Sequence, residues 1–483
     1  MEELLLGLEY EVLQKGSCKV DYSGMEYDSR KVTEGDIFVA LEGAVSDGHD
    51  YINQAIARGA KGVLVSKKVQ TDFPCECILV KDLRKNLGKI ASNFYNYPQR
   101  KLKIIGITGT NGKTTSTYLL ESILGAERVA RIGTVEYKIG DEIIEAPNTT
   151  PESLDVVKLC KKAVDKGLEY LVMEVSSHAL SLGRVDMLEF DVASFTNLTL
   201  DHLDYHKNMD NYFEAKRKLF TMLKKSGSDS INIDDQYGDK LYKEFGGYSY
   251  SLTKPADLTG EILEFHSDGQ LVKLNLLGDI FEEKLSILGR YNLYNVLGVI
   301  GIALQLGIEK ERILERIRDT KGAPGRFELV NCGQNFIVVV DYAHTGDALE
   351  NILNSINELK KGRVITVFGC GGDRDATKRP IMGGIAQRLS DIAILTSDNP
   401  RTEDPHSIIE DVKKGMSGDN YLVEEDREKA IMKAIEIAQK NDIILIAGKG
   451  HETYQILGRK KIHFDDREIA RREIVRRKMR GIC

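Results

Sequence analysis

Ten residues, GITGTNGKTT at 106–115, have the types and spacing of a phosphate-binding loop. They lie between a β-rich run, KIIGIT, and a helical pattern, so successive backbone N–H groups and the helix dipole can face an anion. Lys113 can then reach the terminal phosphates of a nucleotide, and the Thr114 hydroxyl can bind Mg²⁺. The phosphate-contacting residues predicted on this basis are Gly109, Thr110, Asn111, Gly112, Lys113, Thr114 and Thr115.

The loop departs from the usual G-x-x-x-x-G-K-[ST] spacing, because Ile107 stands where that pattern has its first glycine. A glycine turn that binds no ligand is the simplest alternative. We favour the phosphate-binding interpretation because Gly-Lys-Thr-Thr falls at the junction of strand and helix. Such a loop by itself does not distinguish a motor, a switch, a kinase or a ligase.

Acidic and histidine side chains that suit a divalent cation follow farther along the chain. Glu174 follows the apolar residues LVM at a strand end, where an acid approaches the metal in P-loop enzymes, although a strand-end Glu can also be solvated. The run TNLTLDHLDYH adds four side chains: Asp201, His202, Asp204 and His206. These could surround a cation or cap the N-terminus of a helix. For Lys216 in EAKRKLF, the pattern alone favours an exposed lysine on a helix.

The elements that must position these residues form three segments. The first alternates short apolar runs with a helical pattern and ends at the polar, proline-containing stretch 97–101. The second alternates helices with apolar strands as far as the Gly/Pro cluster at 321–328, which predicts a mostly parallel sheet covered on both faces. We therefore predict three α/β domains, at residues 1–98, 99–324 and 325–483.

In the third segment four β-rich runs each lead into a polar turn: NFIVVVDYAHT, RVITVFGCGGDRD, IAILTSDNPR and DIILIAGKGHE. Ligands of open α/β sheets bind beyond the carboxyl ends of the strands. We therefore expect a Rossmann-like α/β domain whose turns converge on one cleft.

Composition narrows the class of protein. A hydrophobic content of 42% and a charged content of 29% are typical of soluble globular proteins. No apolar run approaches the roughly 20 residues that span a bilayer, and the acidic N-terminus is unlike a signal peptide, so we expect a cytoplasmic protein with no membrane span. The seven cysteines lack CxxC spacing, and we expect them to be reduced. The net charge of -7 argues against nucleic acid as a partner and requires local groups to hold any anion.

Nine motifs in chain order resemble those of the Mur ligases of peptidoglycan synthesis: TGTNGKTT, MEVSSHAL, TNLTLDHLDYH, EAK, LGRYNLYN, DYAHT, FGCGGDRD, DNPR and GKGHE. The resemblance covers essentially the whole chain and is closest to the members that add a diamino acid to UDP-MurNAc-L-Ala-D-Glu. These ligases share the shorter TGTNGKTT loop, so Ile107 is a mark of the family.

The resemblance implies an N-terminal domain for the uridine nucleotide, a central P-loop ATPase domain and a C-terminal domain for the incoming amino acid. The implied reaction joins UDP-MurNAc-L-Ala-D-Glu to the diamino acid and converts ATP to ADP and phosphate. The D-Glu carboxylate takes the γ-phosphoryl group to become an acyl phosphate, which the amine then attacks.

By the same resemblance, the catalytic residues are Lys113, Glu174, His202 and Lys216. Thr114 and Glu174 are implied to hold one Mg²⁺, and His202 with Lys216 a second. The lysine at the Lys216 position is carbamylated by CO₂ in the family, becoming N6-carboxylysine. That modification turns a cation into a carboxylate and conflicts with an exposed lysine.

Further binding residues are implied in the same way. For the uridine nucleotide they are Ser29, Ala44, Val45, Ser46, Thr149, Thr150, Ser176 and Arg184. For ATP, beyond the loop, they are Asn292, Arg326, Asp341 and His344. Leu182 stands where some members have a contacting Gln, so we assign it no contact. Gly346 replaces the Pro of the usual DYAHTPDAL, and this turn should be less rigid.

In the family, DNPR marks the members that add meso-diaminopimelate. The diaminopimelate contacts implied are Arg374, Asp398, Asn399, Pro400, Arg401, Gly448 and Glu452. Arg374 and Arg401 can each form bidentate hydrogen bonds to a carboxylate, and Asp398 and Glu452 can accept hydrogen bonds from an ammonium. Gly448 allows the ligand to approach the backbone closely. Lysine lacks the distal carboxylate and would leave an arginine unpaired. The alternative is a DNP turn with a surface arginine.

Three other functions stay open. A lysine-adding member of the family differs only in its amino acid. A Mur-like ligase such as folylpolyglutamate synthetase is disfavoured by DNPR, GGDRD and the uridine-side motifs. A P-loop switch or motor, from a different class, would hydrolyse ATP in response to a macromolecular partner. We expect the ligase to act as a monomer.

Overall fold

The computed structural model describes residues 1–16, 21–43, 46–266 and 268–481. Two uridine-side positions, Ala44 and Val45, lie outside these residues. The chain separates into two compact units, of which the first contains residues 1–110, 124–229 and 244–246 and the second contains 111–123, 230–243 and 247–483. Neither predicted domain boundary coincides with a boundary between the units, so the three-domain division stays a prediction.

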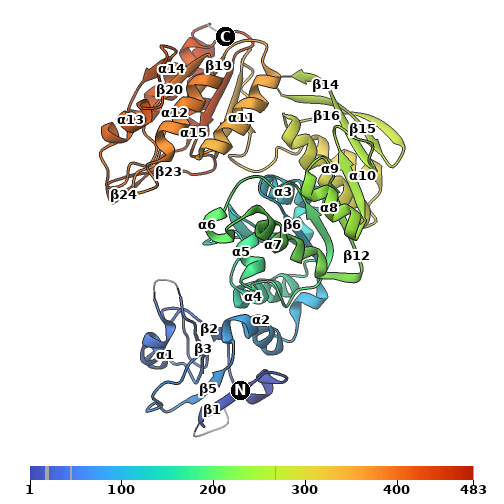
Figure 1. The fold of residues 1–483 in the computed structure, drawn as a ribbon, viewed down its shortest axis with the longest axis vertical. Coiled ribbons are helices and arrows are strands. Elements are labelled where there is room, and N and C mark those ends of the chain that lie inside the picture. Colours follow the sequence, from blue (N-terminus) through green and yellow to red (C-terminus); the bar gives the residue numbers. More distant parts are fainter. Residues whose placement is uncertain (17–20, 44–45, 267, 482–483) are drawn as a thin grey trace. The chain divides into compact units, whose positions relative to one another are not determined.

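A five-stranded sheet of order β1-β5-β4-β3-β2 forms the N-terminal part of the first unit (Figure 1). Its elements are η1 (Glu2–Leu5), β1 (Tyr10–Gln14), β2 (Met25–Glu26), β3 (Ile37–Ala40), η2 (Gly48–Tyr51), α1 (Ile52–Ala57), β4 (Gly62–Val65), β5 (Glu76–Val80), α2 (Leu83–Phe94) and η3 (Pro98–Lys101). Only β1 is antiparallel to its neighbour. Strand alternation places Ile37 and Val39 in the core beneath α2 and Phe38 in the core beneath α1.

The first unit also contains the strands β11-β6-β10-β7-β8-β9, in this order, of an eleven-stranded sheet whose remaining strands are β12 to β16. Its elements are β6 (Lys103–Thr108), η4 (Ala126–Arg128), β7 (Val129–Ile132), β8 (Glu136–Ile139), β9 (Glu142–Glu145), α4 (Ser153–Asp165), β10 (Tyr170–Glu174), α5 (Ser177–Ser181), β11 (Phe190–Phe195), α6 (Leu203–His206) and α7 (Met209–Thr221). Strands β11, β6, β10 and β7 are parallel, and β8 and β9 add an antiparallel hairpin. The register pairs Glu174 with Ile107 and Phe195 with Thr108, so the segments that follow these strands begin at one edge of the sheet.

The second unit begins with α3 (Lys113–Leu124), the helix after the phosphate-binding loop. Its next elements are β12 (Leu223–Asn232, shared with the first unit), α8 (Gln236–Phe245), β13 (Tyr248–Ser251), β14 (Leu258–His266), β15 (Gly269–Leu276), β16 (Asp279–Leu285), α9 (Arg290–Gln305) and α10 (Lys310–Arg318). Strands β12, β13 and β14 are parallel, whereas β14, β15 and β16 form an antiparallel meander that the sequence analysis did not predict.

A six-stranded sheet of order β17-β18-β22-β19-β20-β21 completes the second unit. Its elements are β17 (Glu328–Leu329), β18 (Ile337–Asp341), α11 (Gly346–Leu359), β19 (Val364–Phe368), α12 (Lys378–Leu389), β20 (Ile392–Leu395), α13 (Pro405–Lys413), β21 (Tyr421–Val423), α14 (Arg427–Ile437), β22 (Ile443–Ala447), the hairpin β23 (Tyr454–Leu457) and β24 (Lys460–His463), and α15 (Asp466–Met479). Within the six-stranded sheet all pairs but β17–β18 are parallel, and β23 and β24 form a separate antiparallel pair. Helices α11, α12 and α13 cover one face and α14 and α15 the other (Figure 1).

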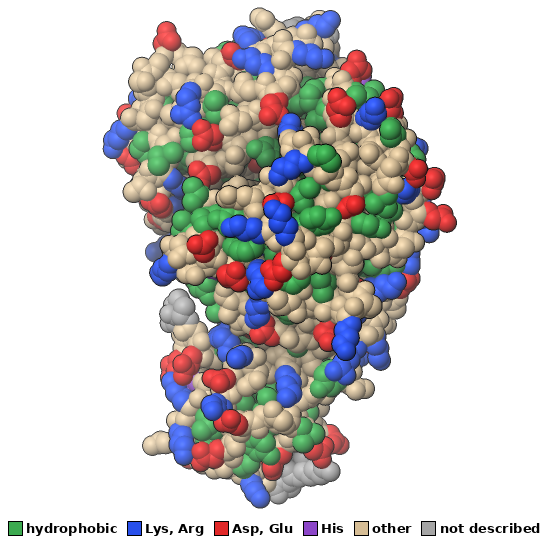
Figure 2. All heavy atoms as spheres, turned by 45° about the vertical axis from the view of Figure 1, so that its right-hand side comes forward, with side chains coloured by type: hydrophobic (Ala, Val, Ile, Leu, Met, Phe, Trp, Pro, Cys, Tyr) green, Lys and Arg blue, Asp and Glu red, His purple; other side chains and the backbone are tan. Residues whose placement is uncertain are grey.

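The predicted α/β class with mostly parallel sheets is confirmed, including the four β-rich runs of the third segment. Among the residues that the structure describes, no helix is both long enough and apolar enough to cross a bilayer. On the face shown in Figure 2, acidic and basic side chains are interspersed, as the near balance of 67 basic and 74 acidic residues predicts.

Candidate active site

The phosphate-binding loop between β6 and α3 requires glycine at two positions. Gly109 has a φ of 144°, and a Cβ there would lie 1.9 Å from the Thr196 hydroxyl oxygen. Gly112 has a φ of 89°, and its Cβ would lie 2.3 Å from Oδ1 of Asn295. Glycine is therefore required at both positions because the loop backbone packs closely against Thr196 and Asn295, and the loop joins a strand to a helix N-terminus as a phosphate-binding loop does.

The other ATP-side residues near the loop sit at the start of α3 and in α9. Thr114 and Thr115 are buried in the first turn of α3. Asn292 is buried in α9, where its Nδ2 donates to the Leu288 carbonyl (2.9 Å) and its Oδ1 accepts from Asn295 (3.3 Å). Asn295 thus connects Asn292 with Gly112. Asn295 was not among the predicted residues, although it follows Asn292 by one helical turn.

Glu174, the predicted metal ligand, is buried at the end of β10, with 1% of its surface exposed. Its Oε1 accepts from the Thr134 backbone N–H (2.7 Å) and its Oε2 from the Thr134 hydroxyl (3.1 Å). A solvated carboxylate is therefore the wrong interpretation of this strand-end acid.

Histidine and tyrosine rings stack around the predicted ligand His202. The His178 ring lies 4.9 Å from that of His202, edge to face, and the ring of buried His206 stacks on Tyr212 at 4.9 Å. Nε2 of His206 also lies 2.9 Å from the Ser177 hydroxyl. Burial lowers the pKa of both His178 and His206, and the nearby imidazoles add to the effect. The histidines thus belong to one aromatic cluster rather than to a simple helix cap.

Lys216 is buried, with 1% of its surface exposed, so the exposed lysine that the local pattern favoured is wrong. Its Nζ donates to the Gly109 carbonyl (2.7 Å) and lies 4.7 Å from the centre of the Tyr212 ring. The reason is helical periodicity: Tyr212, Phe213, Lys216, Leu219 and Phe220 form the buried face of α7. The structure therefore places Lys216 against the phosphate-binding loop, where the family resemblance puts a modified lysine.

Four predicted uridine-side residues lie together beside Glu174. The Thr149 hydroxyl is 3.1 Å from that of Thr134, which also binds Glu174. The Thr150 hydroxyl donates to the Glu174 carbonyl (2.8 Å) and accepts from the Ser176 N–H (3.1 Å). Nη1 of Arg184 donates to the Thr150 carbonyl (3.0 Å). The two other described residues make separate contacts: the Ser29 hydroxyl donates to Gln54 (2.7 Å), and Ser46 is exposed, with its carbonyl accepting from the Gly43 N–H (2.9 Å).

The remaining ATP-side residues gather around Tyr342 in the second unit. The guanidinium of Arg326 lies 4.8 Å from the Tyr342 ring, and the rings of His344 and His451 lie 4.6 and 5.1 Å from it. Asp341 accepts backbone N–H groups through both carboxylate oxygens. Burial raises the pKa of Asp341, and burial next to Arg326 lowers that of His451 to about 4.

The predicted amino-acid site centres on a lysine that the sequence analysis did not single out. Lys449 has no exposed surface, and its Nζ donates to Oδ1 of Asn399 (2.8 Å) and lies 3.2 Å from Asp398 and 3.6 Å from Glu452. Asn399 also donates to Glu452 (2.9 Å). At Gly448, whose φ is 119°, a Cβ would lie 2.9 Å from Oδ2 of Asp398. Both acids predicted to receive a ligand ammonium therefore already face one ammonium of the chain.

The arginines of this site border the same turns. Arg401 has a φ of 54° and its Nη1 donates to the Gly372 carbonyl (2.7 Å). A Cβ on Gly371 would lie 3.0 Å from Nη1 of Arg401 and 4.0 Å from Cγ of Arg374, so both arginines lie beside this glycine. A Cβ on Gly372 would clash with the Pro400 carbonyl at 1.9 Å. The structure thus brings together all seven residues predicted to contact the amino acid.

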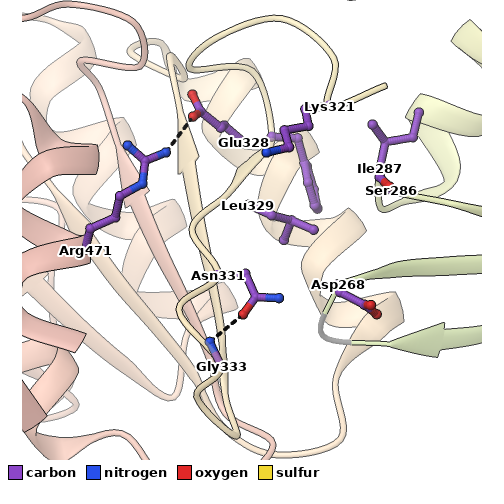
Figure 3. A pocket seen from close by; sticks show the side chains of 10 residues that line it. Asp268, Ser286, Ile287, Lys321, Glu328, Leu329, Asn331, Gly333 and Arg471 are labelled. Atoms are coloured by element: carbon purple, nitrogen blue, oxygen red, sulfur yellow. Dashed lines mark hydrogen bonds and ion pairs between the residues drawn. The ribbon is translucent and has the colours of Figure 1, made fainter. Parts of the chain in front are cut away.

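A separate cavity of about 590 Å³ lies elsewhere in the second unit (Figure 3). Its lining includes Asp268, Lys321, Glu328 and Arg471, none of which was predicted to do chemistry. Glu328 and Arg471 pair across it at 3.5 Å. We assign this cavity no role.

A phosphate-binding loop at the end of a parallel strand, together with an open α/β sheet whose polar turns converge, defines a nucleotide-dependent enzyme. Residues 21–95, 107–303 and 325–450 match, in order, the Mur ligase family catalytic domain, the Mur ligase middle domain and the Mur ligase glutamate ligase domain. The chain therefore belongs to the Mur ligase family.

Individual relatives match over nearly the whole chain. The chain is 57% identical over 475 residues to the UDP-N-acetylmuramoyl-L-alanyl-D-glutamate--2,6-diaminopimelate ligase of Fusobacterium nucleatum, covering 98% of both chains. It is 50% identical over 476 residues to the protein of that name from Clostridium botulinum, covering 96% of this chain and 97% of the relative. A solved structure of a ligase of the same name is 33% identical, with a TM-score of 0.69 and 95% of each chain covered.

Proposed function

We propose that this chain is an ATP-dependent ligase that adds meso-2,6-diaminopimelate to the D-Glu residue of UDP-MurNAc-L-Ala-D-Glu, in the cytoplasmic stage of peptidoglycan synthesis. The observation that carries the proposal is the grouping of Asp398, Arg401, Gly448, Glu452 and Arg374 at the carboxyl ends of β19, β20 and β22. The names of the relatives at 57% and 50% identity support the same substrates.

We propose that residues 1–98 bind the uridine nucleotide, 99–324 bind ATP and 325–483 bind the amino acid. The three separate family matches, at 21–95, 107–303 and 325–450, support this division. The contacts among Thr150, Ser176 and Arg184, and that of Thr149 with Thr134 beside Glu174, support a uridine-nucleotide site that reaches Glu174. The D-Glu end of the substrate would then meet the ATP-binding loop.

Charge is the main physical problem of the reaction, since a carboxylate must meet the γ-phosphate of ATP. Lys113 and Mg²⁺ would neutralise that charge, with Thr114 and Glu174 holding one ion and His202 with Lys216 a second. A lysine ammonium at position 216 would repel a cation, whereas its carbamate would attract one. The burial of Lys216 against the Gly109 carbonyl supports this assignment, because the modified side chain would already be in place.

The choice of amino acid depends on the two arginines and the buried lysine. Arg374 and Arg401 supply two positive charges for the two carboxylates of diaminopimelate. Lys449 neutralises one of the two acids around it, which leaves one negative charge for the distal ammonium of the ligand. Lysine has a single carboxylate, so it would leave one guanidinium without a partner.

The test is phosphate release from ATP by the full chain. We expect rapid release only when UDP-MurNAc-L-Ala-D-Glu and diaminopimelate are both present. Rapid release with neither substrate would instead support a P-loop switch or motor. Release with a folate substrate would support the folylpolyglutamate alternative.

A further inference from the structure

Two arginines share one buried carboxylate in the first unit. Oε2 of Glu152 accepts from Nη1 of Arg84 (2.6 Å) and lies 3.7 Å from Nε of Arg184. Arg184 is a predicted uridine-nucleotide contact, whereas neither Arg84 nor Glu152 has been given a role. The exposed fractions of the three side chains, 36% for Arg84, 18% for Arg184 and 11% for Glu152, leave both guanidiniums accessible to a ligand.

The elements that carry these residues are packed together. Leu83 and Leu87 of α2 and Leu154 and Val157 of α4 belong to one hydrophobic core. Arg84 lies in the first turn of α2 and Glu152 is the N-cap residue of α4, so this core fixes their approach. The second arm of Arg84, Nη2, donates to the Glu42 carbonyl (2.9 Å) in the segment after β3.

The hydrogen bonding of this trio is incomplete. Oε1 of Glu152 and Nε of Arg184 are buried, and neither has a hydrogen-bond partner within the described part of the chain. Two guanidiniums and one carboxylate leave a net charge of +1 at the trio. The unpaired N–H of Arg184 and the net charge of +1 suit a further anion, whereas Oε1 of Glu152 can only accept from a donor.

A cavity of about 670 Å³ opens beside Arg84. Its lining includes Leu41, Glu42 and Ser66 from the segments that follow β3 and β4, and Leu182 and Gly183 from the segment that precedes Arg184. Its charged side chains are balanced in sign: Arg84, Lys85 and Lys218 against Glu42, Asp82 and Asp186. The charges around the cavity therefore do not select an anion by themselves, and of the trio only Arg84 lines the cavity, with Arg184 reached through the shared Glu152 carboxylate.

We propose that Arg84 is a second arginine for the diphosphate of the uridine nucleotide, and that Glu152 is its internal counter-ion until the nucleotide binds. This inference rests on the proposed function, since Arg184 is the other arginine. Each guanidinium would bind one phosphate of the diphosphate. These charge-assisted hydrogen bonds would replace the contacts that both arginines make with the Glu152 carboxylate.

The test measures binding rather than ligation, so it is independent of whether the chain is a ligase. Dissociation constants for UDP and UMP are measured for the wild type, Arg84→Gln and Glu152→Gln. Arg128→Gln is the matched control, because Arg128 is 32% exposed and pairs with Glu169 at the same 2.6 Å without a place in the site.

We expect the wild type to bind UDP more tightly than UMP. Arg84→Gln should weaken UDP binding about tenfold or more while UMP binding changes little, since a charge-assisted contact is lost. Glu152→Gln should tighten UDP binding, because the competing anion is removed. Arg128→Gln should leave both constants unchanged.

A merely structural role for the trio would weaken UDP and UMP binding equally in Arg84→Gln and would also weaken both in Glu152→Gln. Either result overturns the proposal, as does a wild type that binds UDP no better than UMP. Melting temperatures of the variants, compared with that of Arg128→Gln, show whether any loss comes from unfolding.

Discussion

Replacing Lys449 with methionine tests whether a buried ammonium holds the amino-acid site together. Methionine has nearly the length of lysine but no charge and no donor. The change removes hydrogen bonds of 2.8 Å to Asn399 and to the Tyr454 carbonyl, and it removes the ion pair of 3.2 Å with Asp398. Asp398 is then left as a buried carboxylate without this partner.

The magnitude follows from these contacts. Hydrogen bonds to a charged group contribute about 1.5–3 kcal/mol each. Removing one partner of a buried ion pair costs about 3–5 kcal/mol, and the two figures overlap rather than add. We therefore expect the C-terminal part of the second unit to lose about 3–5 kcal/mol. For a domain of this size each kcal/mol lowers the melting temperature by about 2–4 °C, which gives a fall of roughly 6–20 °C.

Calorimetry on the full chain would measure this fall, with Lys461→Met as the control. Lys461 lies in the nearby hairpin and is exposed, and its ammonium contacts the Tyr454 ring at 3.8 Å. Such an exposed cation–π contact contributes only about 0.5–1 kcal/mol. We also expect Lys449→Met to raise the KM for diaminopimelate far more than the KM for ATP. A melting temperature within about 2 °C of the control would refute the reasoning, since that is less than 1 kcal/mol.

Three further predictions concern the site and its pH dependence. Arg401→Ala should raise the KM for diaminopimelate far more than that for ATP, and an equal rise in both would remove its assigned role. Lys216→Ala should abolish ligation, with partial rescue by added short-chain carboxylates, whereas unchanged activity would show that no carbamate is used. Because burial lowers the pKa of His451 to about 4, unfolding takes up a proton between pH 6.5 and 4, and stability should fall as pH falls through that range. His451→Gln should reduce this dependence in urea titrations by the share of His451, while His178 and His206, whose pKa burial also lowers, keep theirs. His463, whose pKa Glu468 raises, should contribute in the opposite direction, losing stability as pH rises.

Much of the fold could be predicted because its strands are rich in β-branched and other apolar residues. The β-branched runs that became β18, β19, β20 and β22 are buried on both faces, so they needed no alternation to be recognised. The meander β14–β16 was missed, although Asp268-Gly269 at its first turn is a turn signal. Its second turn has positive φ at both Leu277 and Gly278, and a leucine there gives no turn signal.

The site residues could be predicted where a sequence motif determines the backbone conformation. They were harder to predict where the role of a side chain depends on whether it is buried. Gly109 and Gly112 were found because only glycine fits their positions. Lys216 was misjudged because a charged residue suggests exposure, although the spacing of Tyr212 and Leu219 places it on the buried face of α7. Lys449 gave no signal because it lies in a turn between two glycines, and only the folded chain reveals the acids around it. Carbamylation has no sequence signal at all.

The most direct test of the proposed function is the mass of the product formed from UDP-MurNAc-L-Ala-D-Glu and ATP when diaminopimelate and lysine compete at equal concentration. We predict the diaminopimelate adduct almost alone, because two guanidiniums require two carboxylates. A product that contains mainly lysine, or no tripeptide while ATP is still hydrolysed, would contradict the proposal.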